Sequence, residues 1–410
     1  MVKQGYKPTE IGVIPEDWEV VPLSNVFSYI SYGFTNPMPT TNNGSWMVTA
    51  NDVKNGRINY ETARKTSEYA FKKLITDKSR PRVGDLLLTK DGTLGRVAIV
   101  DKSNICINQS VAVIRTNDKI EVKFLKHLLQ DNFYQKVMIE NAGGSTIKHI
   151  YITVVDKMPI VLPPLAEQEA IAAALSDADA WIDSLEQLIA KKRLIKQGAM
   201  QTLLTPPSHA EALEAWEVKK LGEVASYRRG SFPQPYGLDK WYDDTNGMPF
   251  IQVFDVAKNR KLKIDTKRKI SELAQPMSVF VPKGTIVLTI QGSIGRIALT
   301  QYDAYCDRTL LIFEKIDSGL DKFYFLLAVE QIFEIEKEKA PGGTIKTITK
   351  EALSDFEIKY PKSLSEQERI ATILSDMDAE LEALATQLGK ARQIKQGMMQ
   401  ELLTGRTRLV

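Results

Sequence analysis

The fold is decided by the stretch from Leu165 to Thr205, which reads LAEQEAIAAALSDADAWIDSLEQLIAKKRLIKQGAMQTLLT. A second stretch, from Leu364 to Thr404, reads LSEQERIATILSDMDAELEALATQLGKARQIKQGMMQELLT. The two stretches align without a gap at a constant offset of 199 residues, and about 23 of the 41 aligned pairs are identical. An internal repeat of this length indicates that the chain is built as two halves.

Both stretches have the periodicity of a long helix that packs on another helix. Apolar residues recur at alternating intervals of four and three, a heptad seam that extends over about three heptads. They are Ile171, Leu175, Ala178, Ile182, Leu185 and Ile189 in the first copy, and Ile370, Leu374, Met377, Leu381, Leu384 and Leu388 in the second. The strict register then meets Lys196 and Lys395. With a rise of ~1.5 Å per residue, each copy predicts a rod of about 60 Å.

The layout of the chain favours antiparallel pairing of the two helices. Only the short segment PPSHAEALEAW separates the first helix from the second globular block. Parallel pairing would require the chain to return about 60 Å through this linker and the second block. We therefore expect antiparallel helices, with the two blocks at opposite ends and related by a pseudo-twofold axis.

Composition excludes several classes of protein. The chain has 410 residues, which suggests two or three domains. It contains no apolar run of 18 residues and no apolar segment near its first residue, so we expect a cytoplasmic protein without a membrane span. Cys106 and Cys306 lie in apolar runs and are predicted to be buried reduced thiols, and the three histidines lack ligand spacing, so no metal site is expected.

Charge is distributed unevenly along the chain. Residues 18–160 contain 19 Lys and Arg against 13 Asp and Glu, an excess of 6 positive charges. The two repeated helices have net charges of −2 and −3. Contact with a polyanion is therefore expected at the globular blocks and not along the helices.

A glycine-centred motif is repeated inside the blocks. It reads VGDLLLTKDGTLGRVAIV from Val83 to Val100 and KGTIVLTIQGSIGRIALT from Lys283 to Thr300. Each copy predicts strand, turn and strand, with positive φ values at the glycines of the turn. Exposed backbone amides, a hydroxyl group and an arginine in one turn can bind phosphate oxygens. A purely structural hairpin with a solvated arginine is the alternative interpretation of this turn.

Two further kinds of loop supply polar side chains. The loops SYGFTNPMPTTNNGS and RRGSFPQPYGLDKWY differ most between the halves, as expected if each reads different bases. A second repeated loop reads NAGGSTIKHI in the first half and APGGTIKTI in the second. Together with the glycine turns, these loops give the candidate DNA-binding residues Tyr32, Thr35, Asn36, Lys90, Thr93, Arg96, Lys148, Arg229, Ser231, Gln234, Tyr236, Gln291, Ser293, Arg296 and Lys346.

Over residues 9–405 the chain resembles the specificity (S) subunit of type I restriction–modification systems. The resemblance rests on the opening TEIGVIPEDWEVVPL, the glycine motif in both halves, the junctions VLPPLAEQEAIAAALSDAD and YPKSLSEQERIATILSDMD, and the duplicated IKQGxMQxLLT endings. It implies an α+β fold in which two similar α/β target-recognition domains are separated by a pair of long antiparallel coiled-coil helices. The expected segments are a first domain at 1–162, a spacer helix at 163–206, a second domain at 207–361 and a C-terminal helix at 362–410.

The resemblance also implies the partners. Each domain would read one half of a split, asymmetric DNA sequence. Two modification subunits that hold S-adenosylmethionine would methylate adenine, and two restriction subunits that use ATP and Mg would join them. No cofactor is expected in this chain, which has no glycine-rich cofactor loop and no Walker motif, so it is predicted to be non-enzymatic. The alternative function is a coiled-coil scaffold with two protein-binding modules and no role on DNA.

Overall fold

The chain folds into two compact units, each of which contains one globular block and half of each long helix. The structure, a computed structural model, describes residues 4–144, 148–208, 213–339 and 348–409. Unit 1 comprises Met1–Glu186 with Gln387–Val410, and unit 2 comprises Gln187–Thr386. This grouping crosses the four segments expected from the sequence, because each long helix contributes its first half to one unit and its second half to the other.

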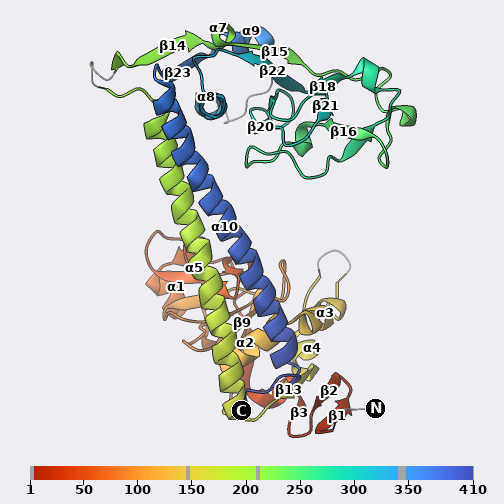
Figure 1. Ribbon diagram of the computed structural model, residues 1–410. Helices are drawn as coiled ribbons and strands as arrows, with labels where there is room; N and C mark the ends of the chain where they lie inside the picture. The colour runs from red at the N-terminus through yellow and green to blue at the C-terminus, as the bar shows by residue number, and fades with distance from the viewer. Residues whose placement is uncertain (1–3, 145–147, 209–212, 340–347, 410) are drawn as a thin grey trace. The chain divides into compact units, whose positions relative to one another are not determined.

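Unit 1 is built from short strands, four helices of its own and parts of both long helices (Figure 1). Its strands are β1 (Tyr6–Thr9), β2 (Gly12–Pro15), β3 (Glu19–Pro22), β4 (Phe27–Tyr32), β5 (Ser45–Val48), β6 (Val53–Lys54), β7 (Arg57–Ile58), β8 (Arg64–Thr66), β9 (Leu86–Thr89), β10 (Val97–Ile99), β11 (Ile105–Ile107), β12 (Val111–Thr116) and β13 (Pro159–Leu162). Its helices are α1 (Glu68–Lys73), α2 (Val122–Gln130), α3 (Asn132–Glu140) and α4 (Ile152–Lys157), followed by the long helix α5 (Leu165–Leu203). Short 3₁₀ turns are η1 (Leu23–Val26), η2 (Ala50–Asp52) and η3 (Asp77–Ser79).

Unit 2 repeats most of these elements in the same order. Its strands are β14 (Trp216–Lys220), β15 (Ala225–Arg229), β16 (Met248–Ile251), β17 (Arg268–Ile270), β18 (Val279–Val281), β19 (Ile286–Thr289), β20 (Ile297–Leu299), β21 (Ala304–Cys306), β22 (Leu310–Ile316) and β23 (Glu357–Pro361). Its helices are α7 (Leu221–Val224), α8 (Lys322–Lys339) and α9 (Lys350–Ser354), followed by the long helix α10 (Leu364–Leu402). Its 3₁₀ turns are η4 (Asp239–Trp241), η5 (Val253–Asp255) and η6 (Gln275–Met277).

The main sheet of each block has the same topology. The strand order is β10-β9-β12-β4 in unit 1 and β20-β19-β22-β15 in unit 2, with all neighbours antiparallel. Every residue of β9 and β19 is buried, because both faces of the sheet are covered. In β9, Leu86 and Leu88 join the core that contains α2, while Leu87 joins the core shared with the second sheet. The apolar runs LLLT and IVLT are therefore central strands and not half-exposed ones.

A second sheet in each block contains the first strand after the divergent loop, β5 in unit 1 and β16 in unit 2. Its strand order is β11-β5-β8 in unit 1 and β17-β16-β21-β18 in unit 2. Each of these sheets contains one parallel pair, β5 with β11 and β16 with β21. Both predicted cysteine thiols are free and buried at this sheet, and burial raises the pKa of Cys106 to about 12. The prediction of buried reduced thiols is confirmed.

The junction before each long helix is fixed by a buried glutamine. Gln168 donates to the carbonyl of Pro163 (2.8 Å) and accepts from the amide of Glu121, the cap of α2, at 2.9 Å. Gln367 does the same in unit 2, with Pro361 (2.7 Å) and Asp321 (2.7 Å). The repeated glutamine of LAEQ and LSEQ thus ties the start of the long helix to the start of α2 in unit 1 and of α8 in unit 2. Buried backbone groups at two chain turns are satisfied in this way.

The long helices pair antiparallel within each unit. In unit 1, Asp179 accepts from Lys395 at 2.5 Å and Glu186 from Arg392 at 2.6 Å, so rising numbers on α5 meet falling numbers on α10. Unit 2 shows the same direction, since Lys192 pairs with Glu380 at 2.7 Å and Lys196 with Asp378. The predicted fold class, with two similar α/β blocks and two long antiparallel helices, is confirmed (Figure 1).

The two lysines that interrupt the heptad seam are the partners of two aspartates. Lys196 and Lys395 have side chains only 13% and 18% exposed, and they bind Asp378 and Asp179 on the opposite helix. Burial alone would raise the pKa of Asp179, but the hydrogen bond and charge of Lys395 hold it below its ordinary value. A buried polar pair in an apolar seam is well suited to fix the register and direction of two helices.

Each block is attached to the helix pair through the same two acidic positions. In unit 1, Lys126 of α2 binds Asp179 at 3.2 Å, and Arg57 binds Asp183 one helical turn later. The equivalent positions in unit 2, Asp378 and Glu382, bind a different pair of cations. Arg260, whose side chain is 7% exposed, binds Asp378, and Lys261 binds Glu382 at 2.9 Å. The helices thus present one charge pattern twice, and each block meets it with its own side chains.

His127 introduces a pH-dependent term into unit 1. It is fully buried on α2, near Lys126, Lys395 and Asp179, and its Nε2 lies 3.3 Å from the Ser176 hydroxyl. Its Nδ1 has no hydrogen-bond partner in the described part of the chain. Burial, and then the positive charge of Lys126, lowers the pKa of His127 to about 3.

We expect His127→Leu to make unit 1 less sensitive to acid. Below pH 6.5 the unfolded chain binds a proton that the folded state excludes until about pH 3, so stability falls as the pH is lowered through this window. At pH 5.5 the cost is about 1.4 kcal/mol relative to neutral pH. The counterpart of His127 in α8 is the buried Leu327, so leucine suits the position. Urea unfolding of both proteins at pH 8 and pH 5.5 measures the difference, and an equal loss in both would contradict the assignment.

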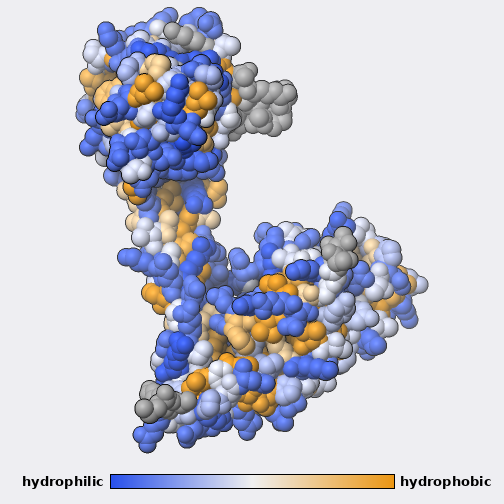
Figure 2. All heavy atoms as spheres, turned by 90° about the vertical axis from the view of Figure 1, so that its right-hand side faces the viewer, coloured by the Kyte–Doolittle hydropathy of each residue, from blue (hydrophilic) through white to orange (hydrophobic). Residues whose placement is uncertain are grey.

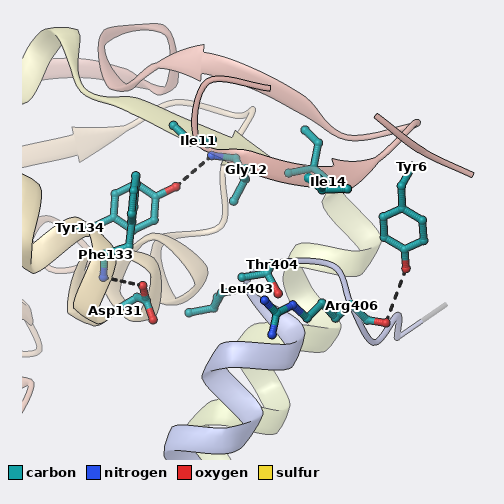
Figure 3. A pocket seen from close by; sticks show the side chains of 12 residues that line it. Tyr6, Ile11, Gly12, Ile14, Asp131, Phe133, Tyr134, Leu403, Thr404 and Arg406 are labelled. Carbon is teal, nitrogen blue, oxygen red and sulfur yellow. Dashed lines mark hydrogen bonds between the residues drawn. The ribbon is translucent and has the colours of Figure 1, made fainter. Parts of the chain in front are cut away.

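The two ends of the chain meet in unit 1. The Tyr6 hydroxyl donates to the carbonyl of Gly405 at 2.9 Å, and Arg408 binds both Asp17 (2.7 Å) and the buried Glu167 (2.6 Å). Gly405 has φ +68°, and a Cβ there would lie 2.5 Å from Pro15, so the chain needs glycine after α10. A pocket of about 440 Å³ lies between the β1–β2 hairpin, the start of α3 and the end of α10 (Figure 3).

The surface is mainly hydrophilic, as expected for a chain in which 26% of the residues are charged. Hydrophilic side chains cover much of the face shown in Figure 2, with apolar groups in smaller patches between them. Within the described residues, no helix combines the length and hydropathy needed to cross a membrane.

Candidate nucleic-acid interface

The glycine turn of each main sheet is held by a threonine that sequence reasoning missed. Gly92 and Gly95 have φ +77° and +78°, as predicted, and Gly292 and Gly295 have φ +67° and +83°. The hydroxyl of Thr89, the last residue of β9, donates to the carbonyl of Thr93 and accepts from the amide of Arg96 at 2.9 Å. Its side chain therefore closes the turn from inside.

Unit 2 repeats this geometry. Thr289 donates to the carbonyl of Ser293 at 2.5 Å and accepts from the amide of Arg296 at 3.0 Å. The signal in the sequence was the threonine that ends both LLLT and IVLT, four residues before the hydroxyl residue of the turn. Thr93 and Ser293 are themselves half-buried, and their backbone carbonyls accept the hydrogen bonds that hold the turn.

The arginine of each turn has a structural contact. One guanidinium nitrogen of Arg96 donates to the carbonyl of Val53 at 3.2 Å, and one of Arg296 donates to the carbonyl of Val256 at 3.4 Å. Both side chains are half-buried. A guanidinium has five donors, so these bonds brace the adjacent loop and leave other donors for a phosphate. The predicted phosphate contact of both residues stays a prediction.

In unit 1 the divergent loop and the glycine turn line one groove. The groove has a volume of about 870 Å³, and it is lined by the predicted residues Thr35 and Asn36 together with Gly92 of the turn. Tyr32 is half exposed and lines an adjoining pocket of about 360 Å³ that shares Thr35 and Asn36. The structure therefore brings together three candidate residues of the loop and the tip of the turn.

Lys90 and Lys148 differ in how free their charges are. Lys90 binds the carboxylate of Asp91 at 3.0 Å and lies over the Tyr32 ring, and Asp91 also contacts His149 at 2.7 Å. Lys148 is exposed beside this cluster. The network Tyr32–Lys90–Asp91–His149 orders the rim of the groove, and it leaves Lys148 as the more available cation for a phosphate.

Several groove residues were not found from the sequence. They are polar or basic and come from three separate segments: Asn51, Lys54, Arg64, Asn108, Gln109 and Ser110. Asn51 lies within η2, Lys54 ends β6, and Asn108 begins the turn after β11. Only the polar turn NQS between two apolar strands could have signalled this part of the groove.

In unit 2 the candidate loop residues form a smaller network. The hydroxyl of Tyr236 accepts from Gln252 at 2.7 Å and donates to Asp307 at 3.2 Å. Burial, and then the charge of Asp307, raises the pKa of Tyr236, so this phenol is protonated at neutral pH. Ser231 donates its hydroxyl to the carbonyl of Met277 at 3.0 Å, which uses it in a structural bond.

The other unit 2 candidates are surface residues. Arg229, Gln234 and Gln291 are exposed and are accessible to a ligand. Lys346 lies outside the described residues. The ring of Tyr242 stacks under the guanidinium of Arg268, 3.7 Å from the ring centroid, and packs on Phe232 beside Tyr236. This aromatic and cationic surface was not predicted from the sequence.

Comparison with known proteins identifies the family. The sequence matches the type I restriction modification DNA specificity domain twice, at residues 15–192 and 214–390. It is 26% identical over 421 residues to the MjaVIII type I restriction enzyme specificity subunit of Methanocaldococcus jannaschii, covering 97% of this chain and 94% of that protein. It is 24% identical over 386 residues to the MjaIX specificity subunit of the same organism, covering 87% of this chain and 85% of that one.

The fold agrees with this match. The crystal structure of a type I restriction–modification S subunit from M. genitalium superposes with a TM-score of 0.60 over 94% of this chain and 96% of the other, at 18% identity. Two matched domains cover most of the sequence, and each lies over one block and the long helix that follows it. This chain belongs to the family of type I restriction modification DNA specificity domains and carries two copies of that domain.

Proposed function

We infer that this chain selects the DNA sequence on which a type I restriction–modification complex acts. The inference follows from the family, which is described as a DNA specificity domain, and from its relatives, which are specificity subunits. In this proposal each block reads one half of a split DNA sequence. The two long helices hold the blocks apart and set the number of base pairs between the halves.

The proposal rests on one observation: the two blocks share a framework, but they present different side chains beside the glycine turn. Both blocks share the sheet order, the threonine-held glycine turn and the buried junction glutamine. The loops beside the turn differ: unit 1 presents Thr35 and Asn36, whereas unit 2 presents Gln234 and Tyr236. A shared framework suits a repeated target such as duplex DNA, and different linings predict two different half-sites.

The mechanism divides the contacts into two kinds. Lysine and arginine side chains of each block neutralise phosphates, so affinity should fall steeply as the salt concentration rises. Polar side chains of the loops hydrogen-bond to base edges in the major groove, where each base pair has its own donor and acceptor pattern. The acidic helices contribute no contact of the first kind, since their net charges are −2 and −3.

The chemistry is assigned to partner subunits. In the proposed complex, two modification subunits bind S-adenosylmethionine and methylate adenine, and two restriction subunits use ATP and Mg. This chain selects the DNA sequence and supplies no catalytic group. The similarity of the two long helices, in which about 23 of 41 aligned residues are identical, supports the proposal that the same kind of partner docks on each.

Co-expression of this chain with a cognate modification subunit tests the proposal. Genome-wide mapping of N6-methyladenine should then reveal one split, asymmetric motif that is absent when this chain is omitted. The same modification subunit without this chain is the control. Unchanged methylation in the presence of this chain and an active modification subunit would contradict the proposal.

A coiled-coil scaffold without a role on DNA is distinguished by a second measurement. If the chain is only a scaffold, it should have no affinity for duplex DNA at any salt concentration. The specificity subunit, assembled with its modification subunits, predicts binding that weakens as salt is raised. The family match favours the specificity subunit.

A further inference from the structure

Two turns occupy equivalent places in the two blocks. In unit 1 the turn Asn108–Ser110 joins β11 to β12, and in unit 2 the turn Asp307–Thr309 joins β21 to β22. The carboxamide oxygen of Asn108 accepts from the amide (3.2 Å) and the hydroxyl (2.6 Å) of Ser110. The carboxylate of Asp307 accepts from the amide (2.9 Å) and the hydroxyl (2.5 Å) of Thr309. The central residues, Gln109 and Arg308, therefore stand on the same frame.

Both frames are anchored to the sheets on either side. The amide of Asn108 donates to the carbonyl of Val48 at 3.3 Å, and the amide of Asp307 donates to that of Ile251 at 3.0 Å. The flanking strands β11 and β12 are buried over most of their length, as are β21 and β22. A side chain presented by such a turn is held by rigid strands and not by a mobile loop, which suits a specific contact.

Gln109 belongs to the groove of unit 1. It lines this groove together with the candidate loop residues Thr35 and Asn36. Its backbone amide donates to the carbonyl of Phe34 at 2.8 Å, which ties the turn to that loop. Its carboxamide makes no hydrogen bond within the described part of the chain. Both the donor and the acceptor of this side chain are therefore available to a ligand.

Arg308 is exposed and forms no ion pair with any described carboxylate. Its guanidinium lies 5.6 Å from the centre of the Tyr236 ring. The hydroxyl of Tyr236 is fixed in turn by Gln252 and by Asp307, the first residue of the same turn. The arginine thus extends from an ordered support, and its guanidinium has no hydrogen-bond partner among the residues that the structure describes.

Glutamine and arginine are two side chains that read purines through paired hydrogen bonds. Glutamine binds the N6 and N7 of adenine, and arginine binds the O6 and N7 of guanine. Glutamine can hydrogen-bond to a phosphate but cannot neutralise its charge, so a purely electrostatic role does not account for both Gln109 and Arg308. Lys54 and Arg64 line the same groove and supply positive charge there for the phosphates.

We propose that Gln109 and Arg308 are the equivalent base-reading residues of the two blocks, with Gln109 binding an adenine of the first half-site and Arg308 a guanine of the second. This assignment rests on the proposed function, because it presumes that each block reads one half-site. It names the side chain at one position of each half-site and the purine that this side chain binds.

The substitution Arg308→Gln tests the assignment, because it places the residue of unit 1 on the frame of unit 2. The full-length chain, assembled with its modification subunits, is used to select duplexes from a library with randomised half-sites. The wild type should enrich a G·C pair at one position of the second half-site. The variant should prefer A·T at that position, with a change in preference of about tenfold or more. All other positions should keep their preferences.

Gln109→Arg is the reciprocal variant and should change one position of the first half-site from A·T to G·C. The control is Arg369→Gln, which removes an exposed arginine from α10 of the same unit and should leave the sequence unchanged. A uniform loss of affinity for all sequences with Arg308→Gln would make Arg308 a phosphate contact and overturn the assignment.

The half-sites selected by the wild-type complex also test the assignment, even if a variant does not fold. A second half-site without any G·C pair would overturn the assignment of Arg308. The two proposals fail separately: a wild-type complex that selects no sequence contradicts the proposed function. A wild-type complex that selects a split sequence, with neither variant changing a single position, contradicts only the base-reading assignment.

Discussion

Removal of one heptad from each long helix is expected to shorten the spacer of the methylated sequence by about three base pairs. Seven residues correspond to ~10 Å of helix, and one base pair to ~3.4 Å of duplex. Deletion of residues 185–191 and 384–390 removes equivalent segments of the repeat. The partners Asp179 with Lys395 and Lys196 with Asp378 lie outside the deleted segments, so each unit keeps its own register. Methylation of the original sequence should be lost.

Mapping of N6-methyladenine in cells that co-express the shortened chain and its modification subunit measures the effect. Both half-sites should be unchanged, because neither block is altered. Deletion of residues 185–191 alone is the control. It leaves the two helices unequal in length, so the charge pairs of the two units cannot all stay in register, and we expect a poorly folded protein. A shortened chain that methylates the original sequence would show that the helices do not set the spacing.

Replacement of Asp378 by alanine is expected to lower the free energy of unfolding of unit 2 by about 3 kcal/mol, because it leaves buried cations without their partner. Asp378 binds Lys196 of α5 and Arg260 of the globular block, whose side chains are 13% and 7% exposed. Without the carboxylate these two positive groups face each other, and among the described residues only Glu330 still pairs with Arg260. Urea unfolding of the full-length chain measures the loss.

Asp376 provides a matched control on the same helix. It lies two residues earlier, is exposed and has no ion pair among the described residues. Asp376→Ala should change stability by less than about 0.5 kcal/mol. Equal effects of the two substitutions would mean that the charge network contributes nothing to the attachment of the block. Asp378→Asn keeps the shape and separates the effect of charge from that of packing.

The helices could be predicted in detail because their signal is periodic and local. Residues three and four apart lie on one face of a helix, so the heptad seam is visible in the sequence. The repeat is visible when the two halves are aligned. The apolar runs LLLT and IVLT, with glycines four to seven residues after Leu88 and Leu288, likewise predicted strand and turn. The antiparallel direction followed from the length of the linker.

The partners of the two lysines that interrupt the heptad seam could not be predicted from the sequence. The sequence showed Lys196 and Lys395 at positions where apolar residues were expected. Their partners, Asp378 and Asp179, lie about 180 to 220 residues away, and only the antiparallel register pairs them. A lysine at a seam position is destabilising until the opposite helix supplies a carboxylate.

The candidate interface was predicted only in part. Thr35 and Asn36 were identified because they stand in a loop that differs between the halves. Asn51, Arg64 and Gln109 line the same groove but come from segments that are separate in the sequence. Each is an ordinary polar residue beside a strand, and its role depends on which strands pair.

The sequence by itself determined that the chain has two halves, that each half ends in a long helix, and which glycines form the turns. The two halves follow from the repeat at an offset of 199 residues, which needs no knowledge of the fold. The helices and the turns are determined by residues within about two helical turns or one hairpin of each other. The tertiary structure decided which block cations attach to the helices, which threonine closes each turn, and that Gln109 and Arg308 stand on equivalent frames. The ion pairs of Lys126 and Arg260 join residues 53 and 118 positions apart, so they exist only once the helices are in register. The hydrogen bonds of the threonines and of the two turns are local, but the position of each turn depends on which strands pair.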